Sequence, residues 1–280
     1  MELRIWIDVS REGDEILAYG LTANLKNRGF DLLITIRRGM ERVFGGSTEV
    51  LTIGPLAKGP FEEVVNELSL YKAVGRGKVK DLVHISLASL EASRVAFGLR
   101  IPLILILDDV VSVRELRLIA PLADVIIYPK IIRLPKVIAS ETRLLSLDGY
   151  LEDVAVSELG IIYHQSGTVL AFKPRGIKKG FKEIGPAELV SCRLKVRAFI
   201  TSNRRLARIV ALRGIPTLLT LKRRGLRVEQ DMIKEGYPLS IGMDMSSLPS
   251  FNVMNPKAGK DGELVRNIIE AIEYVVAKGG

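Results

Sequence analysis

Apolar and polar positions alternate in two rhythms along the first half of the chain. Short runs of Ile, Leu and Val predict strands buried on both faces, and longer segments with apolar residues every three or four positions predict helices. Strands are expected at residues 3–9, 31–36, 49–53, 81–85, 101–107 and 124–128, and helices at residues 15–28, 61–74, 89–99 and 111–122. This alternation predicts an α/β fold, a doubly wound parallel sheet with helices on both faces.

The helix expected at residues 61–74 shows how the pattern assigns an inward face. Val64, Val65, Leu68 and Tyr71 recur at helical spacing on one side of it. A stripe of this kind usually packs against the core of a globular protein. We therefore expect these four side chains to be buried.

The second half of the chain changes character after residue 129. Residues 130–158 contain Pro135 and Gly149, and are interpreted as a crossover between domains at 1–150 and 151–262. A hairpin or two short strands are expected at 161–163 and 168–172. Further helices are expected at residues 186–192, 226–235 and 263–277, with an irregular segment at 246–262.

The segment that begins at Ser202 carries the first candidate for a ligand site. Ser202 or Asn203 can cap a helix that ends at Gly214. Arg204 and Arg205 then lie in the first turn, where each cation opposes the helix dipole by roughly 0.3–1 kcal/mol. A bound anion would remove this conflict and would meet free backbone amides. The alternative is that both arginines are solvated on the surface of a basic protein.

Acidic residues mark a second candidate site. Asp8, Asp108 and Asp109 stand at the carboxyl ends of predicted strands, where open α/β sheets bind their ligands. The alternative for Asp8 and Asp109 is that each caps the helix that follows. The sequence contains no phosphate-binding loop that ends in Gly-Lys-Ser/Thr, no full Gly-x-Gly-x-x-Gly and no Gly-x-Ser-x-Gly.

Composition indicates which classes of molecule the protein could bind. The chain has 280 residues and a formal net charge of +9, which suits nucleic acid, anionic membranes or phosphorylated small molecules. Aromatic residues make up only 6% of the chain, so platforms for base stacking are scarce. Binding of nucleic acid is therefore an alternative that is not favoured.

Other features bear on the compartment and on metals. The single cysteine, Cys192, excludes an internal disulfide and fits a reducing cytoplasm. His84 and His164 are far apart, so neither a metal nor another cofactor is expected. The longest apolar run, 101–107, is far shorter than the ~20 residues of a membrane span, and the first residues do not follow the pattern of a signal peptide, so none is expected. We expect a cytoplasmic protein, and its aliphatic, arginine-rich composition suits a thermophile.

Four parts of the sequence carry a family likeness. They are residues 4–10, residues 89–102, residues 121–127 with 148–152, and residues 211–217 with 228–229 and 233–236. In this order they resemble an archaeal family of GT-B glycosyltransferase-like proteins that is akin to the nucleotide-sugar 2-epimerases. The likeness covers roughly residues 4–237.

The resemblance implies two Rossmann-like domains that face a cleft, with a nucleotide sugar or related phosphorylated ligand bound between them. It places the nucleotide diphosphate at the helix start near Ser202, and it matches Glu229 to an acidic residue that often holds the ribose. It also implies that the C-terminal helix, 263–280, packs back towards the first domain. The expected donor side consists of Ser202, Asn203, Arg204, Arg205 and Glu229, and the expected acceptor side of Asp8, Asp108 and Asp109.

The sequence departs from the family pattern at catalytic positions. Family histidines are replaced in the loop at 11–14 and at Leu87, and a family Glu-His pair is replaced by Val111 and Ser112. A family Gly-Gly-Thr loop is replaced by residues 201–203. Loss of the histidines removes the usual general base and phosphate partner. Two hypotheses remain open beside nucleic-acid binding: an active glycosyltransferase, and a non-catalytic binding or regulatory relative.

Overall fold

The structure is a computed structural model that describes residues 3–44, 48–75, 79–134, 136–222, 224–248 and 262–279. The chain divides into two compact units. The first contains Met1–Asp148 together with Gly262–Gly280, and the second contains Gly149–Asp261. Most of the segment at 246–262, which was expected to be irregular, lies outside the described residues.

The first unit is built on a parallel sheet of seven strands in the order β3-β2-β1-β4-β5-β6-β7. Its strands are β1 (Arg4–Val9), β2 (Asp31–Arg37), β3 (Glu49–Gly54), β4 (Leu82–Ser86), β5 (Leu103–Ile106), β6 (Val125–Pro129) and β7 (Arg143–Leu147). The first six match the strands expected from the sequence. Strand β7 was not expected, because it lies at the sheet edge, where Leu144 is exposed and the apolar pattern is weak.

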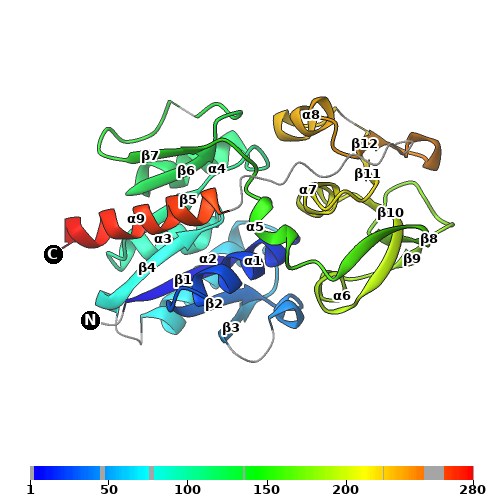
Figure 1. The fold of residues 1–280 in the computed structure, drawn as a ribbon. Helices are drawn as coiled ribbons and strands as arrows, with labels where there is room; N and C mark the ends of the chain where they lie inside the picture. The colour runs from blue at the N-terminus through cyan, green and yellow to red at the C-terminus, as the bar shows by residue number, and fades with distance from the viewer. Residues whose placement is uncertain are drawn as a thin grey trace. The chain divides into compact units, whose positions relative to one another are not determined.

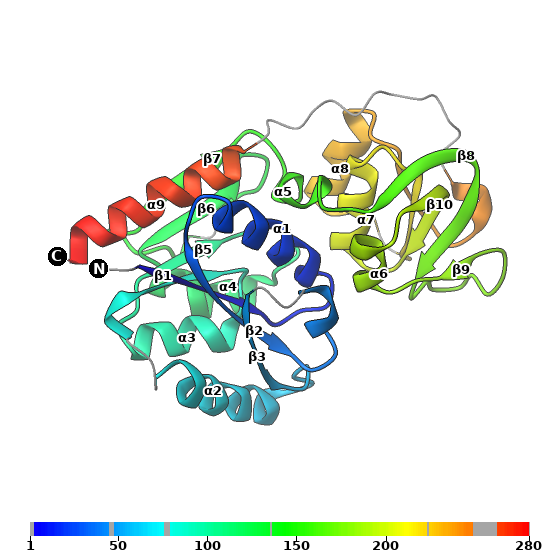
Figure 2. The ribbon, with the colours of Figure 1, turned by 60° about the horizontal axis from the view of Figure 1, so that its bottom comes forward.

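Helices cover both faces of this sheet (Figures 1 and 2). Helices α1 (Asp14–Lys26) and α9 (Glu263–Gly279) lie side by side on one face. The other face carries α2 (Pro60–Val74), α3 (Leu90–Gly98) and α4 (Val113–Ile119), and short 3-10 turns occur at η1 (Glu41–Val43), η2 (Val79–Asp81) and η3 (Ala120–Leu122). Helix α9 packs on β5, β6 and β7. The last helix of the chain therefore lies in the same layer as the first helix, α1.

The expected orientation of α2 is wrong. Val64, Val65, Leu68 and Tyr71 are exposed, whereas Leu70 packs with Val74, Trp6 and Val95 in the core. Both sides of α2 carry apolar residues at helical spacing, so periodicity alone cannot decide which side faces the sheet.

The second unit has a parallel sheet of five strands in the order β12-β11-β10-β8-β9. Its strands are β8 (Ile161–Phe172), β9 (Lys182–Glu183), β10 (Leu194–Thr201), β11 (Thr217–Thr220) and β12 (Leu239–Gly242). The prediction of a hairpin or two strands at 161–172 is wrong, because this segment forms one long strand. Its pairing with β10 shifts from Ile162 to Thr168, so the residues between them bulge from the sheet. In the sequence these bulged residues look like a turn between two strands.

The two faces of the second sheet are covered differently. Its helices are α5 (Asp153–Val156), α6 (Pro186–Ser191), α7 (Arg204–Leu212) and α8 (Arg227–Lys234), and a 3-10 turn, η4 (Met245–Ser247), follows β12. Helix α7 packs on β10 and β11, where Phe199 and Leu219 are buried. On the other face, Ile200 and Leu218 pack against partly buried residues of loops and of η4, which include Phe181 and Met245.

Strand order reverses once in each sheet, between β1 and β4 in the first and between β8 and β10 in the second. Crevices at the carboxyl ends of strands beside such a reversal are the usual ligand sites of open α/β sheets. Within the described ranges, no helix is long and apolar enough to traverse a bilayer.

Candidate functional site

Asp8, near the carboxyl end of β1, is the centre of a buried network in the first unit. Its carboxylate accepts hydrogen bonds from Thr35 Oγ1 and Ser89 Oγ, each at 2.6 Å. Arg37 donates to both of its oxygens, from Nη1 at 3.0 Å and from Nη2 at 3.2 Å. The side chain of Asp8 is completely buried. Its bonds join the ends of β1 and β2 to the start of α3.

A second carboxylate shares the guanidinium of Arg37. Glu91, in the first turn of α3, lies 3.4 Å from Arg37 Nη2. Burial lowers the pKa of Arg37, but the carboxylates of Asp8 and Glu91 outweigh it and hold the pKa above its ordinary value. Burial also raises the pKa of Glu91. The network therefore balances buried charges, and in this arrangement the oxygens of Asp8 are engaged within the protein.

The other two aspartates follow β5. Asp108 is buried, and its Oδ1 accepts the backbone N–H of Val110 at 2.9 Å, while Asp109 is partly exposed. Strand β4 lies between β1 and β5, so Asp108 is not an immediate neighbour of Asp8.

The alternative that Asp8 and Asp109 cap the following helices is wrong. Helix α1 has Gly13 at its N-cap, and α4 is capped by Ser112, which forms a capping box with Glu115. Asp8 instead accepts a hydrogen bond from Ser89, the N-cap residue of α3.

Glu15, at the start of α1, was not singled out from the sequence. Its carboxylate accepts the backbone N–H of Gly13 at 2.5 Å, and the side chain is almost completely buried. Burial raises the pKa of Glu15 from 4.5 to about 7, against the opposing effect of this hydrogen bond. Its burial could not be read from the sequence, because the residue lies in a polar stretch after β1.

The start of α7 lies at the strand reversal of the second sheet. Asn203 caps this helix as expected, since its side chain accepts the backbone N–H of Leu206 at 3.1 Å. Ser202 Oγ donates to the backbone carbonyl of Lys173 at 2.7 Å. This bond joins the carboxyl ends of β10 and β8 beside the cap. Gly214, in the left-handed conformation at φ 81°, ends the helix as expected.

Arginines of α7 form ion pairs with Glu229 and Glu152. Arg204 Nη1 donates to Glu229 Oε2 at 2.5 Å, and Arg208 donates to Glu229 Oε1 from Nε at 2.9 Å and from Nη2 at 2.6 Å. Arg205 Nη1 donates to Glu152 Oε1 at 2.8 Å, and Arg208 Nη1 lies 3.4 Å from the same oxygen. We call these five side chains the α7 charge cluster.

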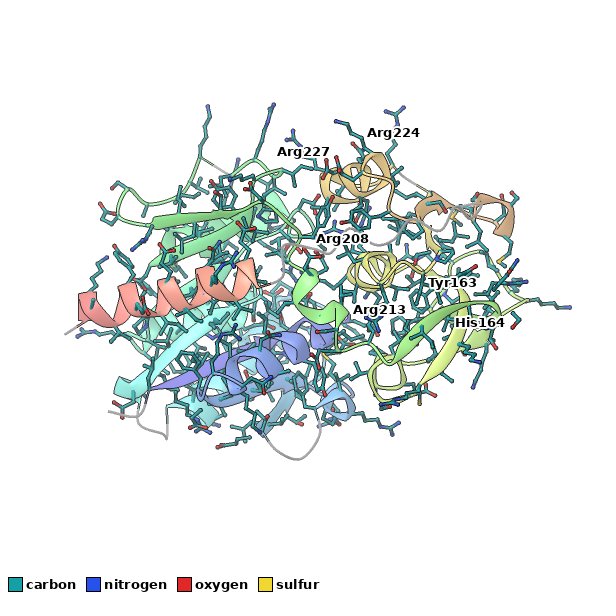
Figure 3. All side chains as sticks on the ribbon, in the orientation of Figure 1. Tyr163, His164, Arg208, Arg213, Arg224 and Arg227 are labelled. Atoms are coloured by element: carbon teal, nitrogen blue, oxygen red, sulfur yellow. The ribbon has the colours of Figure 1, made fainter. Side chains whose placement is uncertain are left out.

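Burial differs within this cluster. Glu229, Glu152 and Arg208 are buried, Arg205 is nearly so, and the side chain of Arg204 is 20% exposed. Figure 3 labels Arg208 on α7. The alternative that Arg204 and Arg205 are simply solvated is therefore wrong. Glu229 also accepts the backbone N–H of Leu226 at 2.5 Å, so its oxygens are engaged in this arrangement.

Two members of the cluster were missed as site residues. Arg208 lies four residues after Arg204, which places both on one face of α7, and this spacing could have linked them. Glu152 lies in a stretch that carries the family likeness, but its partner could not be inferred from the sequence. Among the described residues, no three His, Cys, Asp or Glu side chains are placed to hold a metal ion.

The profile of a family described as "Protein of unknown function (DUF354)" matches residues 3–166. The chain belongs to this family. No curated protein sequence matches this DUF354 chain.

Several solved structures resemble the DUF354 chain. One is MnaA of S. aureus with UDP, at 11% identity and a TM-score of 0.54, over 88% of this chain and 85% of MnaA. A UDP-N-acetylglucosamine 2-epimerase has 13% identity and a TM-score of 0.53, over 88% of this chain and 85% of the epimerase. UGT89C1 of Arabidopsis thaliana with UDP-L-rhamnose has 10% identity and a TM-score of 0.52, over 89% of this chain and 87% of UGT89C1. This likeness confirms the predicted fold class, parallel α/β sheets flanked by helices as in GT-B glycosyltransferases.

Proposed function

We propose that this protein binds a nucleotide sugar or a related phosphorylated ligand, with the phosphates at the start of α7. The observation that carries the proposal is the position of Asn203, Arg204 and Ser202 at the strand reversal of the second sheet. Backbone amides and the helix dipole favour an anion at such a helix start. Structures of similar fold are complexes with UDP and with UDP-L-rhamnose, which supports a nucleotide diphosphate as the ligand.

Arg204 is the cluster member best suited to meet a phosphate. It is partly exposed, whereas Arg208 is completely buried. Its ion pair with Glu229 uses one nitrogen of a guanidinium that has five N–H donors. We infer that Glu229 orients Arg204 and Arg208, in place of the ribose contact that the family resemblance implies. Arg205, held by Glu152, would add positive potential behind the site.

The acceptor side is proposed at the carboxyl edge of the first sheet. Asp108 and Asp109 follow β5 there, and Asp8 would act through the strand ends that it holds. If the protein is an enzyme, it transfers a glycosyl group from the nucleotide sugar. The second candidate is a non-catalytic binding protein, which the replaced family histidines favour.

Titration calorimetry with UDP and UDP-sugars tests the site. We expect Arg204→Ala to weaken binding of UDP at least about tenfold, because one charge-assisted hydrogen bond to phosphate contributes about 1.5–3 kcal/mol. Arg213→Ala is the matched control, since Arg213 is at the C-terminal end of the same helix (Figure 3). Equal affinities of the two variants would show that the site assignment is wrong.

Two further measurements separate the candidate functions. Turnover of a UDP-sugar that binds would favour the enzyme, and tight binding without turnover would favour the binding protein. A nucleic-acid-binding protein would instead show affinity for oligonucleotides that falls steeply with salt, and no affinity for UDP-sugars.

A further inference from the structure

Helix α2 exposes a continuous apolar stripe to solvent. Phe61 is 78% exposed and Leu68 is 56% exposed, and Val64, Val65 and Tyr71 lie on the same side of the helix at helical spacing. We call these five residues the α2 stripe. The inward side of the helix is separate, because it packs through other residues of the core.

A neighbouring helix extends this surface. The hydroxyl of Tyr71 lies so close to α3 that a Cβ at Gly98 would come within 1.9 Å of it. Phe97, the residue before Gly98, is 61% exposed. At these exposures, side chains of this size present on the order of 100 Å² each, so the stripe and Phe97 offer roughly 600 Å². That is at the upper end of the apolar patches of typical monomers.

We propose that the α2 stripe is the interface of a two-fold dimer, in which α2 of one copy packs antiparallel on α2 of a second copy. Two such surfaces would bury about 1,200 Å² of apolar area, within the range of stable protein interfaces. The interface of a two-fold dimer must be complementary to itself. The sequence of the stripe meets this condition when the axis passes level with Asn66. Phe61 then faces Tyr71 of the second copy, and Val64 faces Leu68.

Charge favours the antiparallel arrangement. Glu62 and Glu63 lie in the first turn of α2, and Lys72 lies exposed in the last turn. Antiparallel packing brings Lys72 beside the first-turn carboxylates of the second copy, whereas parallel packing would place like charges together. The same charges argue against a lipid surface, because helices that bind anionic membranes carry basic residues on their polar face.

Mass measurement by light scattering and sedimentation tests the dimer. We expect the protein to be a dimer at micromolar concentration. Leu68→Glu should raise the dissociation constant of the dimer by at least about 100-fold, because the charge would replace an apolar contact twice per dimer. Leu144→Glu is the matched control. Leu144 is 45% exposed on β7, at the opposite edge of the sheet, and its replacement should leave the dimer intact.

Disulfide trapping tests the direction of packing. Val65→Cys, in a background with Cys192→Ser, should form a covalent dimer, because position 65 lies near the proposed axis. Phe61→Cys should not, since its two copies would be about 15 Å apart along antiparallel helices. Trapping through position 61 alone would overturn the antiparallel arrangement. A wild-type monomer at about 100 μM would overturn the proposal, and so would binding to vesicles that Leu68→Glu abolishes.

Discussion

At the scale of single residues, this protein pairs its buried charges across elements. Arg37 joins two carboxylates in the first unit, and Arg208 joins two in the second. Removing one partner of such a group would leave an uncompensated buried charge, which typically costs about 3–5 kcal/mol. Among the described residues, more carboxylates than arginines are buried, so the net charge of +9 understates the positive charge that the surface presents to a partner.

Glu15 should make the stability of the protein depend on pH. Its pKa is about 7 in the folded chain and 4.5 without burial, so the folded state holds a proton that the unfolded state releases between these values. This contribution is fully present below pH 4.5 and is lost as pH rises through about 7. Relative to Glu15→Gln, the free energy of unfolding of the wild type should fall by about 2–3 kcal/mol over this range, as measured by urea denaturation.

Glu41→Gln is the control for this measurement. Glu41 accepts the backbone N–H of Gly39 at 2.6 Å, the same local bond that Glu15 makes to Gly13, but it is exposed. Its replacement should leave the pH dependence unchanged. A wild-type curve parallel to that of Glu15→Gln would show that the carboxyl of Glu15 titrates normally.

At the scale of elements, the start of α7 combines a stable cap with arginines that alone would oppose the helix dipole. Glu152 and Glu229 offset that conflict, so an anion is not required for the helix to form. Folding of the first turn of α7 therefore does not depend on a bound ligand, and a substitution there can affect stability and ligand binding differently. The cap itself contributes about 1 kcal/mol to stability.

Asn203→Asp should change the affinity for UDP without lowering the stability of the protein. Aspartate can accept the same hydrogen bond from Leu206 N–H and favours the helix dipole, so the thermal midpoint should not fall. Its negative charge beside the phosphates should weaken binding of UDP several-fold. Asn203→Ala is the complement, because it should lower stability by about 1 kcal/mol with less effect on binding. Unchanged UDP affinity in Asn203→Asp would contradict the proposed site.

At the scale of the whole molecule, the end of the chain supports the unit in which the chain begins. Val265 and Ile268 of α9 are completely buried within the first unit, far in sequence from the strands that α9 covers. The first unit can therefore complete its core only after the second unit has been synthesised.

Ile268→Ala should lower the stability of the first unit by about 2–5 kcal/mol, because it leaves a cavity in the core. Trp6, the one tryptophan of the chain, is buried in the first unit, so its fluorescence follows the unfolding of that unit. Val276→Ala is the control, since Val276 is 44% exposed on the same helix. Hydrogen exchange in residues 149–261 should be unchanged, and equal loss of protection in both units would show that they unfold together.

The sequence by itself determined the alternation of strands and helices, the parallel sheet of the first unit, and the cap and stop of α7. These features follow from local periodicity, and local side-chain chemistry such as that of Asn203 and Gly214 fixes them.

The tertiary structure decided which side of α2 is buried, the edge strand β7, the continuity of β8 and the partners of the α7 arginines. Each depends on residues far apart in sequence: Leu70 is buried because it meets Trp6, and Arg208 is neutralised because Glu229 reaches it from the next helix. A pattern along one segment cannot show which other segment will cover it. Burial and charge pairing therefore depend on the tertiary contacts of each segment.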